Sequence, residues 1–474
     1  MPQGLVLFRF TKDLRLDDHA GLAAAAARGV VVPLLVIDAG VERAMRSSPR
    51  RAAFFCASVR SLAAELAERG AALVVRRGAA EAIVPDVAAE LNASGAGWSA
   101  CYDAGGMECD ARIQSALEER GFEALVVHDA PAVPPEESAA VRTGGHGYRA
   151  FAPYFETWSA LPIASYEYPL LLAFARPTLT SEPLPSPEEF ASNEPEPPAG
   201  SATARRAFER FLRDDASRYA FAATEPADDR TSHLGAHLSF GTISARSIVR
   251  AVRARANEPF AMNEERLSLR LFLRALAHRD FFLQLSWYHP ATRDEPLQEK
   301  MREFAWERSH RALEAWRAGR TGHALVDAGV RQLHATGWMH PHVRAVAASW
   351  LCFDLGVDWR VGRDEWDRWL VEYDPALATG NWQWIAGVGA DMAQYPRIYN
   401  PERQRRRYDP AGAYVRHWIP ELRQVPLDVW FGRHGASAQL ALALYDGDGY
   451  PAPAVDHEVA ARAFLRRYRE FVSP

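Results

Sequence analysis

A tryptophan-rich run, residues 321–400, constrains this sequence more than any other stretch. Indole side chains bury large apolar areas, so a plain helical core is one explanation of their density. The run also carries Arg344, Glu372 and Asp374, and packing alone does not require so many charges among indoles. The alternative is therefore a core that encloses an aromatic ligand. The tryptophans of the run are Trp338, Trp350, Trp359, Trp366, Trp369, Trp382 and Trp384.

Composition indicates a globular protein of two domains. The chain has 474 residues, 48% of them hydrophobic and 24% charged, and this length exceeds what one compact core usually holds. No apolar run approaches the roughly 20 residues that span a bilayer. The N-terminus MPQGLVLFRFTKD has charges where a signal peptide needs an apolar segment. We therefore expect a cytoplasmic protein without membrane contact.

Charge and cysteine content exclude further classes. A net charge of −5 gives no overall attraction to nucleic acid, although Arg405, Arg406 and Arg407 could form a local basic face. The alternative for these arginines is an ordinary solvated surface. The cysteines lack C-x-x-C pairing, which argues against a disulfide scaffold or structural zinc, and we predict no metal site. They are Cys56, Cys101, Cys109 and Cys352.

The sequence pattern of the N-terminal part predicts a parallel sheet. Short strand-like runs, most of them rich in valine and leucine, alternate with helical stretches, and this order is typical of right-handed β-α-β crossovers. No G-x-G-x-x-G follows the first run, so dinucleotide binding is not indicated there. The predicted strands are residues 4–10, 30–38, 71–77, 98–104 and 123–129.

Helical periodicity replaces this alternation from residue 201 onward. A connector at about 162–200, rich in Pro, Glu and Ser, cannot bury enough apolar surface to fold alone and should run over the surface. The fold class predicted is an α/β domain with a parallel five-stranded, Rossmann-like sheet, followed by an all-α domain. The predicted bounds are 1–131 for the α/β domain, 132–200 for the linker and 201–474 for the helical domain.

The motifs closely resemble the FAD-binding core of the photolyase and cryptochrome flavoprotein family. They are TG-x-x-x-VDA-x-x-RQL-x-x-TGWMH, DWR-x-G, GNWQW and RI-x-NP, in the order and spacing of the family. DLRLDDHAGL, residues 13–22, resembles the start of its antenna domain. The resemblance implies that the helical domain binds FAD and that an antenna pigment, methenyltetrahydrofolate or deazaflavin, could bind the first domain. Glu108 falls near the folate position, or serves only as a partner of a helix N-terminus. The cysteine pattern does not match the iron-sulfur branch.

The resemblance also assigns FAD contacts. Thr231 and Ser232 would hold the pyrophosphate ahead of a helix, with an ordinary helix cap as the alternative. Arg344 with Glu372 and Asp374 would lie beside the flavin ring, or form a structural ion pair. His278-Arg279-Asp280 matches a kinase catalytic loop only in isolation, so that reading is discarded. The implied FAD contacts are Tyr219, Thr231, Ser232, His233, Leu234, Arg279, Arg344, Glu372, Asp374, Ala378 and Asn400.

Three indoles match the tryptophan relay of the family. Trp306, Trp359 and Trp382 would carry electrons from the surface to the flavin, with Trp382 nearest the ring. Indole is oxidised more readily than most uncharged side chains. Each of these tryptophans taken alone would be core by default.

The substrate pocket departs from the usual pattern of cyclobutane-dimer photolyases. Ala275 and His278 stand where they have Glu and Trp, Pro341 and His342 where they have Asn and Arg. Trp384 remains from a stacking pair. Further departures are His233, Gly235, Ala345, Glu372 and Ala378. We therefore expect a reshaped pocket centred on Trp384, His278 and His342, in which the histidines either supply a proton or only bind water.

The resemblance implies a light-dependent DNA repair enzyme that splits pyrimidine dimers with photoexcited reduced FAD. Its partner would be DNA containing such dimers, and we expect a monomer. A cryptochrome-type blue-light photoreceptor without repair activity is the alternative, and the short stretch 423–474 gives no long signalling tail. A light-independent redox flavoprotein is the third possibility.

Overall fold

The structure is a computed structural model that describes residues 4–166, 173–175, 179–308, 310–390, 396–427 and 449–472. The chain forms two compact units. The first unit comprises Met1–Ala220, Ser232–Arg293 and Val371–Leu377, and the second comprises Phe221–Thr231, Asp294–Leu370 and Ala378–Pro474.

The first unit contains a five-stranded parallel sheet in the order β3-β2-β1-β4-β5. Leu7 of β1 is paired with Val32 of β2 on one side and with Ala96 of β4 on the other. The predicted parallel sheet is thereby confirmed. The strands are β1 Leu5–Phe10, β2 Val30–Ile37, β3 Val74–Arg77, β4 Gly95–Ser99 and β5 Glu123–Val127.

The fourth strand lies earlier than predicted, because β4 ends at Ser99 and the expected 98–104 is wrong for most of its length. Gly95 and Gly97 carry no side chains that could show a strand pattern. Their backbones lie close to β5, where a Cβ on Gly95 would come within 2.3 Å of the carbonyl oxygen of Glu123. The residues after Ala100 lead instead into α5, and Asp103 caps that helix by accepting a hydrogen bond from the amide of Gly106.

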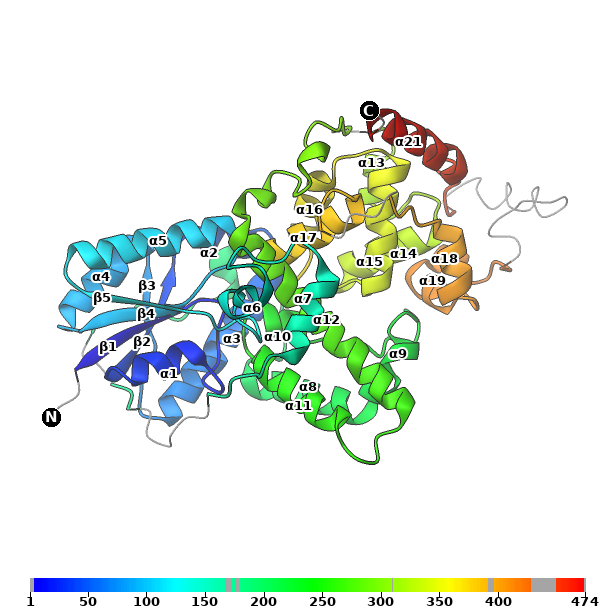
Figure 1. Ribbon diagram of the computed structural model, residues 1–474. Coiled ribbons are helices and arrows are strands. Elements are labelled where there is room, and N and C mark those ends of the chain that lie inside the picture. The colour runs from blue at the N-terminus through cyan, green and yellow to red at the C-terminus, as the bar shows by residue number, and fades with distance from the viewer. Residues whose placement is uncertain are drawn as a thin grey trace. The chain divides into compact units, whose positions relative to one another are not determined.

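Helices cover both faces of the sheet (Figure 1). Because side chains alternate along a strand, Phe8 and Phe10 of β1 point to one face and Leu7 to the other. Phe8 and Phe10 belong to a core with Leu22 of α1, Ala20–Ala26, and with α3, Pro49–Glu68. Leu7 belongs to a second core with α4, Ala80–Glu90, and α5, Ala104–Glu119.

The rest of the first unit is helical apart from the connector. Phe174 bridges to Val31 of β2, and the amide of Val75 in β3 donates to Ser181 Oγ, so the described parts of the connector lie along the sheet. The helices are α2 Ala39–Arg46, α6 Pro135–Arg142, α7 Phe151–Ala160, α8 Ser201–Asp214, α9 Tyr219–Ala222, α10 Gly235–Ser239, α11 Ala245–Ala256 and α12 Asn263–Tyr288.

The second unit is built from helices, as predicted for the C-terminal part. The Thr-Gly pair that opens the first motif lies in the loop before α14. There, buried Asp327 accepts hydrogen bonds from the amides of Thr321 and Gly322. At the other end of α14, Gly337 has a φ of 71°, the left-handed conformation that commonly terminates a helix. Among the described residues from 201 onward, the one bridge recorded joins Glu307 to Val357.

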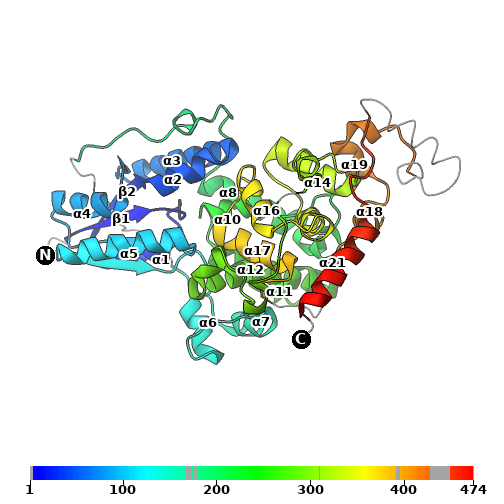
Figure 2. The same ribbon diagram turned by 90° about the horizontal axis from the view of Figure 1, so that it is seen from above.

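Helix α21 runs along the edge of the second unit in both views (Figures 1 and 2), and Phe464 and Tyr468 are its buried residues. Helix α17 starts in the first unit and continues into the second. The helices here are α13 Leu313–Arg317, α14 Ala324–Thr336, α15 Pro341–Ser349, α16 Trp359–Asp367, α17 Pro375–Ala386, α18 Pro401–Tyr408, α19 Ala413–Trp418 and α21 His457–Val472, with a π-helical turn at Trp350–Asp354.

Candidate functional site

The segment assigned to the pyrophosphate, residues 231–234, is a strained turn before α10. His233 is exposed with a φ of 51°, which non-glycine residues adopt uncommonly and often at functional sites. Thr231 donates its hydroxyl to Asp229 at 2.8 Å, whereas Ser232 Oγ accepts from the amide of Leu234 at 3.4 Å. Ser232 therefore acts partly as a local cap, and its hydroxyl hydrogen has no acceptor among the described residues.

Arg279 of α12 lies against the same helix α10. Its guanidinium donates to the carbonyl of Ala130 at 2.9 Å, to Asp280 at 3.1 Å and to the carbonyl of Leu238 at 3.4 Å. Its Nε is buried without a partner among the described residues. A cation with an unused buried donor and a serine hydroxyl that donates to no described residue are both donors that suit a phosphate group. The chemistry of these residues therefore fits the pyrophosphate of FAD.

Glu372 and Asp374 lie in the first unit, and the structure shows what holds each of them. A Cβ on Gly235 would come within 1.7 Å of Glu372 Oε2, so only glycine lets this carboxylate approach the start of α10. Asp374 accepts from the amides of Ala376 and Leu377 at 3.0 and 3.2 Å, and thereby caps α17.

Lys12 is a functional candidate that the sequence analysis missed. Its Nζ lies 3.5 Å from Asp374 and 3.6 Å from Asp103. Burial would raise the pKa of Asp374, but the Lys12 ammonium and the helix amides outweigh burial and hold that pKa below its ordinary value. Asp374 is therefore a charged carboxylate. The one available signal was rarity, because Lys12 and Lys300 are the two lysines of the chain.

Other predicted FAD contacts are placed by ordinary packing and capping. Tyr219 is packed edge-on against Phe211 and Phe272, with ring centroids 6.0 and 5.3 Å away. Asn400 caps α18 by accepting from the amide of Arg403 at 2.9 Å. Leu234 is buried, and Ala378 lies within α17.

Arg344 lies in α15 of the second unit and donates from Nε to the carbonyl of Met339 at 2.6 Å. Its predicted association with Glu372 and Asp374 stays a prediction. The triple arginine of α18 does not present one exposed face, because Arg405 is buried and donates to the carbonyl of Asp409 at 3.1 Å.

The relay tryptophans all lie in the second unit. Trp306 contacts Phe304 and Phe464, at centroid distances of 4.9 and 5.8 Å. Trp359 is fully buried at the first residue of α16. Trp382 is also buried and contacts Trp366 at 4.6 Å, an indole that the sequence analysis counted in the run but did not assign to the relay.

The predicted pocket residues are held by different neighbours. His278 is stacked on Phe151 with centroids 3.4 Å apart, and burial, helped by Arg274, lowers its pKa to about 4. The expectation that His278 supplies a proton near neutral pH therefore does not hold for the ring as it lies here, because it is neutral at that pH. In the second unit, the guanidinium of Arg397 lies 4.7 Å from the centre of the Trp384 ring.

His342 is likewise a weak base in this structure. Its Nε2 lies 3.1 Å from Gln404 Oε1, and its ring centroid is 4.1 Å from that of Tyr408. Burial, more than any neighbouring charge, lowers its pKa. The grouping of His278, His342 and Trp384 in one pocket stays a prediction.

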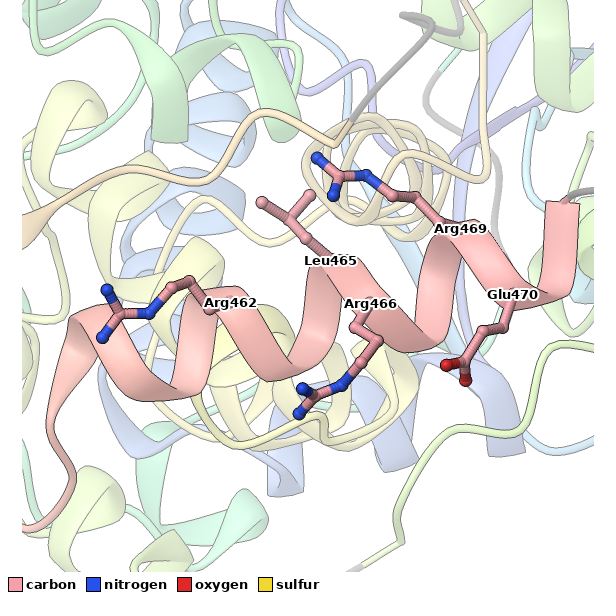
Figure 3. Close-up of a pocket in the computed structure, with 5 residues that line it drawn as sticks. All are labelled: Arg462, Leu465, Arg466, Arg469 and Glu470. Atoms are coloured by element: carbon pink, nitrogen blue, oxygen red, sulfur yellow. The ribbon is translucent and has the colours of Figure 1, made fainter.

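A hollow on α21 is lined by none of the predicted site residues (Figure 3). Arg469 and Leu465 extend from one side of the helix and Arg466 from the other, while Arg462 lies one turn earlier. Arg462 and Arg466 are exposed, so this face is a charged surface in contact with solvent.

Glu108, expected ahead of a helix, instead lies inside α5 with an exposed side chain, so that expectation is wrong.

The described residues contain neither a metal-binding cluster nor a membrane-spanning helix. No group of three or more histidine, cysteine or acidic residues there is arranged to hold a metal ion. Within the same part of the chain, no helix combines the length and the apolar character needed to cross a membrane.

Family models and curated relatives match most of the chain. The profile of the DNA photolyase family matches residues 5–173, and that of the FAD binding domain of DNA photolyase matches residues 272–470. A deoxyribodipyrimidine photo-lyase of Halobacterium salinarum is 34% identical, over 95% of this chain and 96% of its own length.

Solved structures give the same result. A class III photolyase from Agrobacterium tumefaciens has a TM-score of 0.88 and 28% identity, covering 99% of this chain and 98% of that one. A Synechocystis cryptochrome has a TM-score of 0.85 and 26% identity, covering 98% of each chain. The chain therefore belongs to the DNA photolyase family.

Proposed function

We propose that this protein is a light-dependent DNA repair flavoprotein that splits pyrimidine dimers by electron transfer from photoexcited reduced FAD. The observation that carries the proposal is the 34% identity to a deoxyribodipyrimidine photo-lyase over 95% of the chain. The flavin, when bound, supplies the light absorption and the one-electron chemistry, and the protein supplies binding, orientation and electrostatics.

Different residues of this chain would bind the cofactor and the substrate. Ser232 and Arg279 offer hydrogen-bond donors to the pyrophosphate, and Lys12 keeps Asp374 ionised at the start of α17. Trp384 offers an aromatic face to an extruded base, a contact worth about 1–3 kcal/mol. Stacking on this ring would offset part of the free energy that extrusion of the lesion from the duplex costs. We propose that the working species is a monomer acting on DNA that contains pyrimidine dimers.

Repair in light is the direct test. The purified protein, with its flavin chemically reduced, is mixed with an oligonucleotide carrying a defined cyclobutane dimer and then illuminated or kept in the dark. Restored thymines in the illuminated sample alone support the proposal. Equal repair in the dark would assign the protein to light-independent redox flavoproteins, and release of no FAD on denaturation would remove the basis of both.

A cryptochrome-type photoreceptor is the second candidate, favoured by the Synechocystis cryptochrome that covers 98% of this chain. Both candidates bind and photoreduce FAD, so flavin chemistry does not separate them. Repair does. A protein that photoreduces its flavin and restores no base in cyclobutane or (6-4) lesions would be assigned to the photoreceptor class.

The lesion pocket of this chain is proposed to differ from that of ordinary cyclobutane-dimer photolyases. Ala275 has no group that could hydrogen-bond a flipped base, and His278 is engaged with Phe151. We expect weak or altered repair of the cyclobutane dimer, and His278→Trp alone should not restore it fully, since Ala275 still lacks the acid. Affinity and rate typical of the family in the unmodified protein would contradict this proposal.

A further inference from the structure

Two neighbouring arginines of α12 extend from the protein without a carboxylate partner. Arg270 and Arg274 are exposed, and no ion pair or hydrogen bond of either guanidinium is recorded within the described part of the chain. Arg266, one turn earlier, differs from them, because its guanidinium donates to the carbonyls of Glu258 and Ala261 at 2.9 and 3.1 Å. Arg270 and Arg274 therefore keep their hydrogen-bond donors available for a ligand.

Aromatic rings hold the guanidinium of Arg274 in place. Helix α7 packs against α12 (Figure 1), and its rings of Phe151, Phe155 and Trp158 are stacked in succession, with centroids 5.6 and 6.4 Å apart. The guanidinium carbon of Arg274 lies 4.8 Å from the centre of the Phe151 ring and 5.7 Å from that of Phe155. A cation held over aromatic faces has already lost side-chain freedom, so it loses less conformational entropy when a ligand binds.

Acidic groups of α12 do not neutralise the two arginines. Glu264 and Glu265 lie in the first turn of the helix, and Glu265 is paired with Arg255 at 2.8 Å. Asp280 is buried and paired with Arg279 at 3.1 Å. The exposed middle of α12 is therefore locally positive, although the net charge of the chain is −5. Local positive charge of this kind attracts a polyanion.

The spacing of the two arginines suits phosphates of one nucleic-acid strand. Arg270 and Arg274 are four residues apart, so they lie on the same face of α12, about 6 Å apart along its axis. A DNA strand carries one phosphate about every 3.4 Å of its axis. Two long side chains on this face can therefore reach two nearby phosphates, and the planar guanidinium fork matches phosphate oxygens.

We propose that Arg270 and Arg274 bind two phosphates of the DNA strand beside the lesion, and that Phe151 and Phe155 are positioning residues for Arg274. This assignment rests on the proposed function, since Ala275, which directly follows Arg274, is the residue expected at the lesion. Phosphate contacts carry no sequence information. The two arginines should therefore strengthen binding of damaged and undamaged DNA alike, and fix the register of the strand on α12.

The salt dependence of DNA binding in the dark tests the two arginines in the FAD-loaded protein. Each phosphate contact contributes about 0.9 to the slope of log K against log salt concentration. We expect Arg270→Gln and Arg274→Gln each to lower the magnitude of that slope by about this amount, for dimer-containing and undamaged duplexes alike. Arg274→Lys should keep the slope, because it keeps the charge. Unchanged slopes in both Gln variants would overturn the proposal.

The matched control is Arg120→Gln. Arg120 is also exposed, but its guanidinium is paired with Asp86 at 2.6 Å, so its charge is already neutralised. The slope should match that of the unmodified protein. A fall equal to that in Arg274→Gln would show a general effect of net charge and would overturn the assignment to α12.

Single uncharged linkages in the DNA locate the contacts. A methylphosphonate replaces one charged phosphate, and at the phosphate bound by Arg274 it should leave Arg274→Gln with no further loss of affinity. At other phosphates the two losses should add. Arg270→Gln should show the same non-additivity at a different phosphate of the same strand. Additive losses at every position would overturn the proposed contacts.

The aromatic platform has its own test. Phe155→Leu removes one of the two rings at the guanidinium of Arg274 and leaves the charge, so we expect weaker binding with an unchanged salt slope. The same substitution should have no effect on binding in the Arg274→Gln background. An equal loss in both backgrounds would show that Phe155 acts through stability alone and would overturn its positioning role.

Repair separates this inference from the proposed function. If the slopes do not change while the unmodified protein repairs dimers in light, the phosphate contacts are overturned and the proposed function stands. If the unmodified FAD-loaded protein does not bind dimer-containing DNA, both are overturned. An acidic protein segment is the other partner of suitable charge. Binding of polyglutamate that Arg274→Gln abolishes, with DNA binding unchanged, would assign the two arginines to such a partner and overturn the proposal.

Discussion

Individual side chains in this protein owe their chemistry to burial as much as to their neighbours. His278 was expected to face a substrate, yet its ring is stacked on Phe151 and its Nδ1 lies 3.1 Å from the carbonyl of Arg274. Asp374 shows the opposite balance, because Lys12 and two helix amides outweigh its burial. The residue type alone predicted neither pKa shift.

The depressed pKa of His278 predicts a pH dependence of stability. The folded pKa is about 4 and the ordinary value 6.5, so the unfolded chain binds the proton more readily. The contribution of His278 is complete above pH 6.5 and is lost as the pH falls toward 4. We expect a change of about 1–2 kcal/mol, reduced because the ring keeps some contact with water.

His278→Phe should flatten that part of the profile, since phenylalanine can keep the stack on Phe151 and does not titrate. Chemical denaturation at several pH values measures the free energy of unfolding and hence its pH dependence. Because His237 and His323 also have pKa values lowered to about 4, the difference between variant and unmodified protein is the relevant quantity. An unchanged slope between pH 4 and 6.5 would contradict the assigned burial.

At the scale of elements, helix ends and one glycine position the candidate site. Asp374 fixes the start of α17, the helix that carries Trp382 and Trp384. Gly362 lets that helix approach α16, because any side chain there would occupy the place of the Trp382 ring.

Gly362→Ala should push Trp382 off α16. Overpacking of this kind costs about 1–3 kcal/mol of stability. The added methyl should also displace the ring of Trp382, the relay member predicted to lie nearest the flavin, and so slow flavin photoreduction. Gly387→Ala is not a suitable control, because Gly387 has a φ of 71° that alanine rarely adopts. Thermal unfolding and photoreduction that both match the unmodified protein would refute the close approach.

Asp374→Ala should lose a helix cap and leave Lys12 without one of its two carboxylates. The cap alone is worth about 1–2 kcal/mol. Asp374→Asn is the matched variant, since an amide oxygen can still cap α17 but cannot neutralise Lys12. Stability should fall in the order unmodified, Asn, Ala, as measured by denaturation. If Asn is no more stable than Ala, the cap is not the stabilising contact.

Sequence patterns predicted the elements better than the contacts between them. Short runs rich in valine and leucine located most strands of the sheet, but the Gly-Ala-Gly of β4 carries no such pattern and its strand was placed too late. The Trp-rich run marked α16 and α17 as a special core. That Trp366, rather than a more distant ring, touches Trp382 depends on the angle between two helices, which spacing along one chain does not encode.

The same limit applies to Lys12. It lies more than three hundred residues before Asp374, and their ion pair depends on how the end of β1 meets the start of α17. Motif spacing assigned Asp374 to the site, but only the folded chain shows which cation faces it.

At the scale of the whole molecule, we propose that the tryptophans supply electrons to the flavin and take no part in repair itself. An enzyme whose flavin is already reduced needs no relay. Loss of Trp382 should therefore affect the oxidised enzyme and spare the reduced one. This separation tests light-driven repair and the placement of Trp382 together.

The decisive measurement is the number of thymines restored in a dimer-containing oligonucleotide by the unmodified protein and by Trp382→Phe. Each is prepared with oxidised or chemically reduced flavin, and each is assayed with a thiol in light and in darkness. We predict repair in light alone, by both reduced proteins and by the oxidised unmodified protein, and none by oxidised Trp382→Phe. Repair in darkness, or no repair by the illuminated reduced protein with FAD bound, would contradict the account.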